Sequence, residues 1–268
     1  MSNDKVKISR RTMVGAGTLL TAVASGGMTS ARAQGSRKTF VLVHGAWHGG
    51  WCWARVADQL ETEGHRVFMP TNTGLGERSH LLTRDINVST HITDIVNVFK
   101  WNDLSEVVLV GHSYGGLVIS GVADQIPEKL SSIIFLDAFL PEDGDDLISK
   151  SMFRREITDM IGRGEIMLQA PSATSWGVTN PAEQVWVDAK CTPQPIHTWT
   201  EKVRYTGGRE KVAKRAYLRA VGNRSAFFDD ALAKVRALGG WTTHEFACGH
   251  DVMVIQPDEL TQTLLKVS

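Results

Sequence analysis

The 268-residue sequence has few cysteines, no surplus of either charge and, after its first 33 residues, no apolar run long enough to span a membrane. Its three cysteines, Cys52, Cys191 and Cys248, are too few and too scattered for a disulfide framework or a zinc site. Basic and acidic residues number 29 each, which excludes a strongly basic nucleic-acid binder. Because 42% of the residues are hydrophobic, a disordered polyelectrolyte is also excluded.

Residues 1–33 have the pattern of an export signal. A basic start is followed by a weakly apolar stretch over residues 13–28 and by Ala31-Arg32-Ala33, which has the small-x-small pattern of a cleavage site. The segment Ser9–Val14, with Arg10-Arg11, resembles a twin-arginine signal. We therefore predict a periplasmic or secreted protein that is exported folded, with residues 34–268 as the mature domain. The alternative is a disordered basic tail on a cytoplasmic protein.

From residue 39 onward, apolar runs of strand length alternate with segments of helical spacing, which predicts an α/β fold with a mostly parallel sheet flanked by helices. The predicted strands are Thr39–Val43, Arg66–Met69, Glu106–Val110, Ser132–Leu136, Ala216–Ala220 and Thr242–Ala247. The predicted helices are Trp53–Glu63, Val88–Lys100, Leu117–Gln125, Phe228–Leu238 and Asp258–Lys266.

A long interruption, about residues 141–208, separates two of these strands and carries four prolines after its first residue. An insertion of this length is usually functional. We interpret it as a mainly helical cap over the carboxyl edge of the sheet, where open α/β folds bind their ligands. The alternative is a peripheral subdomain whose aromatic residues only pack its own core.

The segment Gly111–Gly115 reads Gly-His-Ser-Tyr-Gly and lies between an apolar strand and a predicted helix. A G-x-S-x-G sequence in this context is the nucleophile elbow of α/β hydrolases. It would hold the Ser113 hydroxyl above the sheet at a helix N-terminus, where the helix dipole favours developing negative charge. Ser113 is therefore predicted to be a nucleophile, and the alternative is a plain strand-to-helix turn.

The segment His44–Gly50 follows the first strand and is rich in glycine. In elbow enzymes this loop supplies one N–H group of the oxyanion hole, and the residue after the nucleophile supplies the other. The backbone amides of Ala46 and Tyr114 are the predicted donors. The alternative is a glycine-rich turn without a catalytic role.

The predicted general base is His250, which follows the last strand and fits the chain order of nucleophile, acid and histidine. A histidine there can accept the serine proton. Its neighbour Cys248 is expected to be a packing residue rather than a second nucleophile. Asp251 is expected to be a solvated or pocket-rim residue.

The acid is less evident, because the usual position after the penultimate strand holds the uncharged Asn223. Asp137 ends an apolar strand at the same sheet edge, and a carboxylate placed there needs a partner. We therefore predict Asp137 as the acid and Asn223 as a supporting residue. The remaining candidates, Asp229 and Asp230, have a sufficient role at the start of a helix.

The segment Phe40–Trp51, the elbow and Ala138–Pro141 together resemble the plant methylesterase and hydroxynitrile lyase branch of the α/β-hydrolase superfamily. The segment Gly74–His80 resembles bacterial esterases of the same superfamily. The resemblance extends over about residues 39–265 and is weakest in the cap. It implies an α/β-hydrolase fold and a serine hydrolase that needs no cofactor and no metal. The plant enzymes carry an aspartate where Asn223 stands, so their acid does not carry over.

The resemblance implies that the chain cleaves small carboxylic esters, and we predict that it does so through an acyl-enzyme on Ser113. Without residues 1–33 the chain is mildly acidic, which gives no reason to expect nucleic acid or a membrane as a partner. Trp47 and His48 are expected to line the substrate pocket, together with Trp186 and Trp199 of the cap. A lactonase, an amidase, a hydroxynitrile lyase and a non-turnover ligand-binding relative are the alternatives. The lyases carry Thr at the position of Gly45 and Lys at that of Asp251, which argues against cyanohydrin cleavage.

Overall fold

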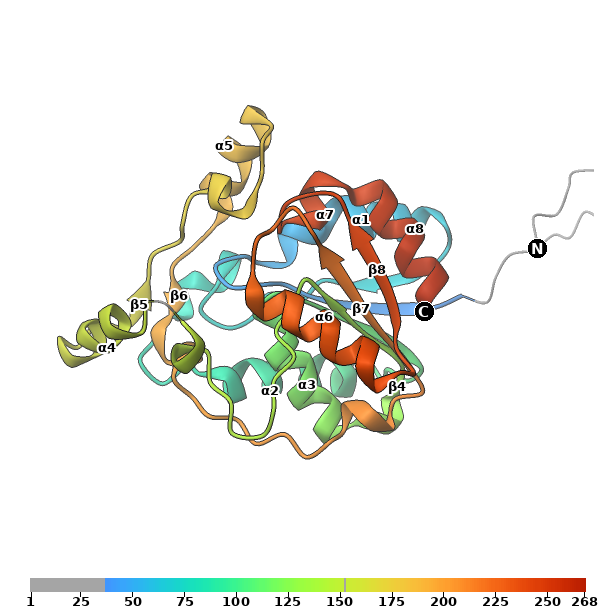
Figure 1. The fold of residues 1–268 in the computed structure, drawn as a ribbon, viewed down its shortest axis with the longest axis horizontal. Helices are drawn as coiled ribbons and strands as arrows, with labels where there is room; N and C mark the ends of the chain where they lie inside the picture. Colours follow the sequence, from blue (N-terminus) through green and yellow to red (C-terminus); the bar gives the residue numbers. More distant parts are fainter. Residues whose placement is uncertain (1–36, 152) are drawn as a thin grey trace, which may run out of the picture. The chain divides into compact units, whose positions relative to one another are not determined.

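The computed structural model describes residues 37–151 and 153–268, so the predicted export signal lies outside the described residues. The sheet has six strands in the order β2-β1-β3-β4-β7-β8, and every neighbouring pair is parallel (Figure 1). The strands are β1 (Thr39–Val43), β2 (Arg66–Phe68), β3 (Val107–His112), β4 (Leu130–Leu136), β7 (Lys214–Ala220) and β8 (Thr242–Phe246). The predicted α/β fold and all six predicted strands are confirmed. The predicted strand ends either coincide with the observed ends or differ from them by one or two residues.

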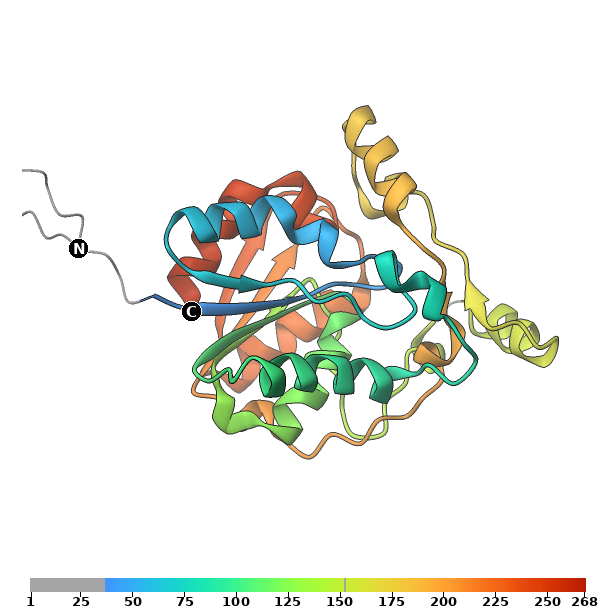
Figure 2. The same cartoon turned by 180° about the vertical axis from the view of Figure 1, so that it is seen from behind.

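Helices cover both faces of the sheet (Figures 1 and 2). They are α1 (Ala54–Thr62), α2 (Val88–Trp101), α3 (Gly115–Gln125), α6 (Ala226–Leu238), α7 (Val252–Ile255) and α8 (Pro257–Val267). Short 3-10 helices occupy Gly50–Trp53, Gly76–Leu81, Pro127–Lys129, Ile148–Lys150, Ala173–Trp176, Ile196–Trp199 and Arg209–Lys211. The five predicted helices are therefore present, and α7 is an additional single turn directly after the predicted general base.

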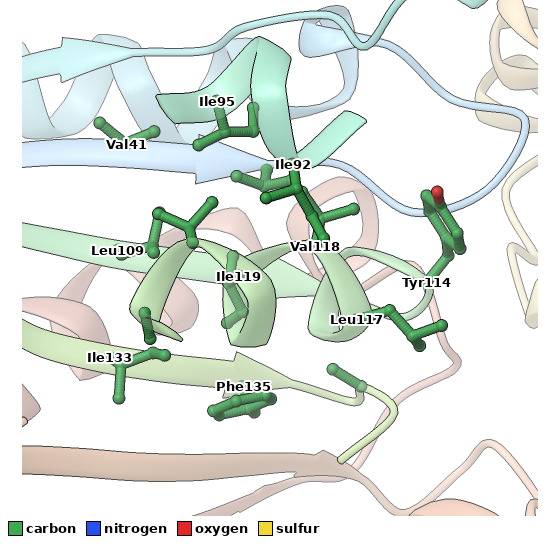
Figure 3. Close-up of a cluster of buried hydrophobic side chains, with 14 of the residues drawn as sticks. Val41, Ile92, Ile95, Leu109, Tyr114, Leu117, Val118, Ile119, Ile133 and Phe135 are labelled. Carbon is green, nitrogen blue, oxygen red and sulfur yellow. The ribbon is translucent and has the colours of Figure 1, made fainter. Parts of the chain in front are cut away.

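The core has two layers because successive side chains of a strand point to opposite faces of the sheet. In β1, Val41 and Val43 pack with α2, α3 and α6, whereas Phe40 and Leu42 pack with α1, α7 and α8. Figure 3 shows the first layer, where Ile92 and Ile95 of α2 lie against the sheet beside α3. Burial on both faces explains the continuous apolar runs in β1 (Thr39–Val43), β3 (Val107–Val110) and β4 (Ile133–Leu136).

The cap insertion, residues 141–208, contains α4 (Arg154–Gly162) and α5 (Pro181–Lys190), which project from the body as two separate arms in Figures 1 and 2. Most of its regular structure is helical, as predicted. It also contains an unpredicted antiparallel pair, β5 (Met167–Leu168) and β6 (Gln194–Pro195). Strands of two residues are too short to leave a recognisable alternation in the sequence.

The cap is joined to the loops at the carboxyl edge of the sheet. The indole N–H of Trp47, after β1, donates to the Leu168 carbonyl over 3.1 Å, and the His250 amide, after β8, donates to the Trp176 carbonyl over 2.7 Å. These contacts position the cap against the edge at which the predicted nucleophile lies. Within the part of the chain that the structure describes, no helix is both long and apolar enough to span a bilayer.

Candidate active site

Ser113 lies in a sharp turn between β3 and α3 and has a backbone φ of 53°, in the left-handed region that non-glycine residues rarely adopt. The turn is held by its amide, which donates to the Leu136 carbonyl over 3.2 Å. Gly115 must be glycine, because a Cβ there would lie 2.9 Å from the His44 carbonyl oxygen. This is the strand–turn–helix geometry of a nucleophile elbow.

The loop after β1 passes directly over this turn. A Cβ on Gly45 would lie 3.1 Å from the Ser113 Cβ, so only a glycine lets the two segments approach this closely. Among the described residues, neither the Ala46 amide nor the Tyr114 amide donates a hydrogen bond. The next amide, that of Trp47, is held by the Gln194 side chain of the cap over 2.9 Å. Two unengaged N–H groups therefore flank Ser113, as an oxyanion hole requires.

His250 is positioned by three different parts of the chain. Its amide is held by the cap, and its carbonyl accepts a hydrogen bond from His112 Nε2 over 3.0 Å. The imidazole stacks on Phe228 of α6, with ring centroids 5.4 Å apart and an interplanar angle of 8°. Its centroid lies 4.4 Å from that of His112, the residue next to Ser113. The imidazole therefore lies at the elbow with little freedom to rotate.

The Asp137 carboxylate accepts a hydrogen bond from His250 Nδ1 over 2.6 Å through Oδ2. The same oxygen accepts from the Asn223 amide over 2.8 Å, and Oδ1 accepts from the Ala220 amide over 3.1 Å. The structure thus brings Asp137, His250 and Asn223 together: the carboxylate binds the imidazole, and the Asn223 amide nitrogen lies against both the carboxylate and His250 Nδ1, 3.1 Å from the latter. A contact to Nδ1 leaves Nε2 free to face the nucleophile.

Sequence reasoning missed Arg219, whose guanidinium lies 2.6 Å from Asp137 Oδ1 and is 1% exposed. Arg219 also binds Asp229 of α6, with 2.8 Å between Nη2 and Oδ1, and donates to the Asn223 carbonyl over 2.6 Å. It therefore connects the carboxylate to the loop that carries Asn223. The available signal was a charged residue within the otherwise apolar strand Ala216–Ala220, which needs a buried partner.

The electrostatic surroundings favour an ionised Asp137. Burial alone would raise the pKa of this fully buried carboxyl, but the hydrogen bond and charge of His250, the Asn223 amide and the Arg219 charge together hold it below its ordinary value. Asp137 can therefore remain charged while His250 gains a proton, which is the state that an acyl transfer needs.

The Ser113 hydroxyl forms no hydrogen bond to any side chain within the described ranges, and Ser113 is half-buried. Catalytic hydrogen bonds are often long in unliganded enzymes and tighten when substrate binds. The arrangement can deprotonate Ser113 through His250 and hold an oxyanion on two amides. These are the groups that nucleophilic acyl transfer requires.

Three of the four residues predicted to line a substrate pocket take part in two aromatic contacts. Trp47 packs on Trp199, with ring centroids 5.8 Å apart, and Trp186 of α5 packs edge-on against Trp51 at 5.0 Å. His48 is only 2% exposed, and its two ring nitrogens are engaged by Ala46 and Asp251. Substrate contact by these residues stays a prediction.

The expectation of a solvated Asp251 is wrong, because its side chain is fully buried. It lies 3.2 Å from His48 Nε2 rather than at a pocket rim. The sequence pattern did not indicate this, since the partner is 203 positions away. Cys248 is buried, as expected of a packing residue, and burial raises the pKa of its thiol to about 12, which makes it a poor nucleophile.

Comparisons with known proteins agree with this geometry. A model of the alpha/beta hydrolase family matches residues 40–263. The chain is 39% identical over 236 residues to the carbendazim hydrolyzing esterase of Nocardioides sp. (strain SG-4G), which covers 84% of this chain and 97% of that protein. It is 38% identical over 117 residues to methylesterase 2 of Arabidopsis thaliana, covering 40% of this chain and 41% of the relative.

Two solved structures share the fold at lower sequence identity. An extracellular alpha/beta-hydrolase from a Paenibacillus species has a TM-score of 0.75 and 22% identity, covering 86% of this chain and 99% of that one. A variant of tomato methylketone synthase I, complexed with beta-ketoheptanoate, has a TM-score of 0.70 and 23% identity, covering 86% of this chain and 96% of that one. The family model, the Nocardioides relative and the elbow geometry lead to one conclusion: the chain belongs to the alpha/beta hydrolase family.

Proposed function

We propose that this protein hydrolyses small carboxylic esters through an acyl-enzyme on Ser113. The observation that carries the proposal is the buried Asp137–His250 contact of 2.6 Å at an elbow whose serine is flanked by two unengaged amides. Packing alone does not require these features to coincide. A nucleophile, a base, an acid and an oxyanion hole in one place together favour acyl transfer.

In the proposed reaction, His250 Nε2 takes the proton of the Ser113 hydroxyl as its oxygen attacks the ester carbonyl carbon. The tetrahedral oxyanion is held by the Ala46 and Tyr114 amides. His250 then protonates the leaving alcohol, and the C–O bond to it breaks. Water, deprotonated by the same imidazole, attacks the acyl carbon of the acyl-enzyme. The imidazolium returns this proton to Ser113 Oγ as the bond between Oγ and the acyl carbon breaks, and the carboxylic acid is released. Asp137 stays ionised throughout and stabilises the imidazolium.

Two observations support hydrolysis over cyanohydrin cleavage on the same scaffold. The lyases place Thr where Gly45 stands, but a Cβ at Gly45 would lie 2.8 Å from His112 Nδ1 and 3.1 Å from the Ser113 Cβ. They place Lys where Asp251 stands, and here that side chain is a buried partner of His48. The site therefore has neither the room for the threonine nor a cation at the lyase position.

The substrate class is tested with purified residues 34–268 on 4-nitrophenyl and methyl esters of graded acyl length. Carbendazim belongs in the panel because a relative is named for its hydrolysis. Mandelonitrile tests the lyase alternative. We expect multiple turnovers on short esters and none on mandelonitrile. Binding without turnover, or cyanohydrin cleavage without ester hydrolysis, would refute the proposal.

The nucleophile is tested with Ser113→Ala and a fluorophosphonate label. The wild-type protein should be labelled at Ser113, and the variant should not be labelled and should lose about 10⁶-fold in turnover, by analogy with serine deletion in a protease triad. Labelling of a different residue in the variant, with activity retained, would show that another group is the nucleophile.

A further inference from the structure

Asp251 begins the single-turn helix α7 but does not cap it with its side chain. An aspartate at this position commonly accepts hydrogen bonds from the first amides of its helix. Here the carboxylate points inward, is fully buried, and has Oδ2 at 3.2 Å from His48 Nε2, while Oδ1 has no hydrogen-bond partner among the described residues. Capping therefore does not explain why an acid stands directly after the general base.

With Asp251 ionised, His48 can make both of its contacts only as a cation. Its Nδ1 lies 2.8 Å from the Ala46 carbonyl oxygen and its Nε2 faces the Asp251 carboxylate, and a carbonyl oxygen and an ionised carboxylate only accept hydrogen bonds. Both ring nitrogens must therefore carry protons. Burial opposes this charge, but the charge and hydrogen bond of Asp251 raise the pKa of His48 well above its ordinary value. Burial likewise opposes ionisation of Asp251, yet the charge and hydrogen bond of His48 hold its pKa below its ordinary value.

The ion pair joins two loops that are far apart in the sheet. Ala46 follows β1 and Asp251 follows β8, and three strands, β3, β4 and β7, lie between β1 and β8. At one end, His48 holds the carbonyl of Ala46, the residue whose amide is a proposed oxyanion donor. At the other end, Asp251 is covalently bonded to His250. The pair thus spans the gap between the proposed oxyanion hole and the proposed base.

The pair sits in a packed environment that gives it little freedom. The His48 ring stacks on Trp51 with centroids 5.2 Å apart and contacts Trp176 at 4.9 Å. The titratable groups facing the pair are His112, whose ring centroid is 6.4 Å from that of His48, Cys191, whose Sγ is 4.0 Å from Nε2, the neighbouring His250, Cys52 and His44. Burial keeps His112 neutral, with a pKa of about 3, so it does not compete for the carboxylate as a cation.

We propose that His48 and Asp251 are positioning residues for ester hydrolysis: as a buried, hydrogen-bonded pair they set the Ala46 amide at a fixed distance from His250. This inference rests on the proposed function. The pair touches no reacting atom, so its effect is on the geometry in which the oxyanion forms. That geometry matters in the transition state and not in the bound ester, so the pair acts on kcat more than on KM.

The test is a double-variant cycle of Asp251→Asn, His48→Gln and the two combined, measured on the short ester that the wild-type protein hydrolyses best. We expect each single variant to lower kcat by about 10–100-fold, the loss typical of residues that orient catalytic groups, with KM changed less than about twofold. Because both residues act through one contact, the combined variant should be little worse than the poorer single variant. Asp146→Asn is the matched control, since Asp146 is a buried carboxylate that accepts from the Ser149 amide.

A merely structural pair would lower the unfolding temperature of the variants and leave kcat of the folded protein unchanged. That result, or losses that simply multiply in the combined variant, would overturn the inference while leaving the proposed function intact. A wild-type protein that hydrolyses no ester would instead refute the function itself, and the inference with it.

Nitrogen-15 NMR of the histidine rings keeps the inference testable if Asp251→Asn does not fold. In the wild-type protein at pH 7, the ring that contacts Trp51 should carry protons on both nitrogens. As the pH rises and this ring loses a proton, kcat should fall in step. A neutral His48 at pH 7, or a kcat that is indifferent to its titration, would overturn the proposal.

Discussion

Three residues of the candidate site, Trp47, Ser113 and Asp137, have a positive backbone φ of 63°, 53° and 41°. They follow β1, β3 and β4, which are adjacent strands. Each such conformation costs a non-glycine residue about 1–3 kcal/mol and persists only where its surroundings enforce it. The chain here bends sharply just beyond three neighbouring strands, and these bends bring Ser113, Asp137 and the loop after β1 together.

At the residue scale, the roles of Asp137 and Asn223 can be distinguished, because only Asp137 carries a charge. Asp137→Asn keeps the shape but removes the negative charge beside His250, and the same change in a serine protease costs about 10⁴-fold in turnover. Asn223→Ala removes one hydrogen bond to the carboxylate, and we expect a loss of only about tenfold, the lower end of the range for orienting residues. The measurement is kcat/KM of both variants on one ester.

The comparison requires folded protein, because Asp137→Asn also deprives the buried Arg219 of a charge partner. Circular dichroism and the unfolding temperature provide that control. If Asn223→Ala proves the more damaging of the two folded variants, Asp137 is a structural residue. The third member of the triad is then neutral.

At the element scale, the loop after β1 leaves no room for a larger residue at Gly45. At its start, His44 Nδ1 donates to the Gly45 carbonyl and His44 Nε2 accepts from the Asn72 amide over 3.0 Å. Further along the loop, the Trp47 amide donates to the Gln194 side chain of the cap. The position of the Ala46 amide, the proposed oxyanion donor, is therefore fixed both by His44, directly after β1, and by the cap.

Gly45→Ala tests this dependence. The added Cβ would meet the His112 ring at 2.8 Å and Ser113 at 3.1 Å, so the loop must shift away from the nucleophile. We expect kcat to fall by about 10²-fold, comparable to losing one oxyanion donor. Steady-state kinetics on the best ester provides the measurement.

Gly162→Ala is the matched control for that change, because a Cβ at this helical position of α4 meets nothing within 4 Å. It should leave kcat unchanged and raise stability slightly, by up to about 1 kcal/mol, since alanine is the better helix former. Equal kinetic losses in both variants would mean that the Gly45 effect is unrelated to the oxyanion loop.

At the scale of the whole molecule, three buried neutral histidines determine how stability responds to acid. Burial lowers the pKa of His44 and His112 to about 3 and that of His91 to about 4. Between these values and about 6.5, the unfolded chain binds protons that the folded chain does not. Stability therefore falls as the pH decreases from about 6.5 to 4, by up to about 1.4 kcal/mol per pH unit for each histidine.

The lowered pKa values of Asp137 and Asp251 extend the loss of stability below about pH 4, because their contribution is present above about pH 4 and disappears as they are protonated in the folded state. His48 has the opposite sign: its raised pKa stabilises the fold below about pH 6.5, and that contribution is lost as the pH rises through its folded value. Urea unfolding at pH 7, 5.5 and 4.5 measures the slope. An unfolding free energy that is flat from pH 7 to 4.5 would contradict the buried, neutral state of the three histidines.

The whole protein also includes the segment before the described residues. We propose that residues 1–33 are a twin-arginine export signal, on the basis of the pattern around Arg10 and Arg11. The exported form should begin near Gln34, and replacing both arginines with lysine should leave the precursor in the cytoplasm. N-terminal sequencing of protein from the producing cell checks this. An intact Met1 or Ser2 on the native protein would refute it.

The sequence by itself determined the strands and helices of the body, and it predicted the carboxyl edge of the sheet as the site of catalysis. Apolar runs such as Thr39–Val43 can be recognised in the sequence because a strand buried on both faces tolerates only apolar side chains. The elbow can be recognised because its glycines are sterically required. Asp137 was found because a charge at the end of an apolar strand requires a partner. These are local signals, contained within about ten residues of chain.

Only the tertiary structure decided the partners of charges that are distant in sequence. Arg219 reaches Asp137 across 82 positions, and Asp251 reaches His48 across 203. No local pattern distinguishes a solvated aspartate from a buried one, because the difference lies in which loop packs over it. In this protein the order of strands in the sheet and the placement of the cap bring the loops after β1 and β8 together, and Asp251 is buried there beside His48.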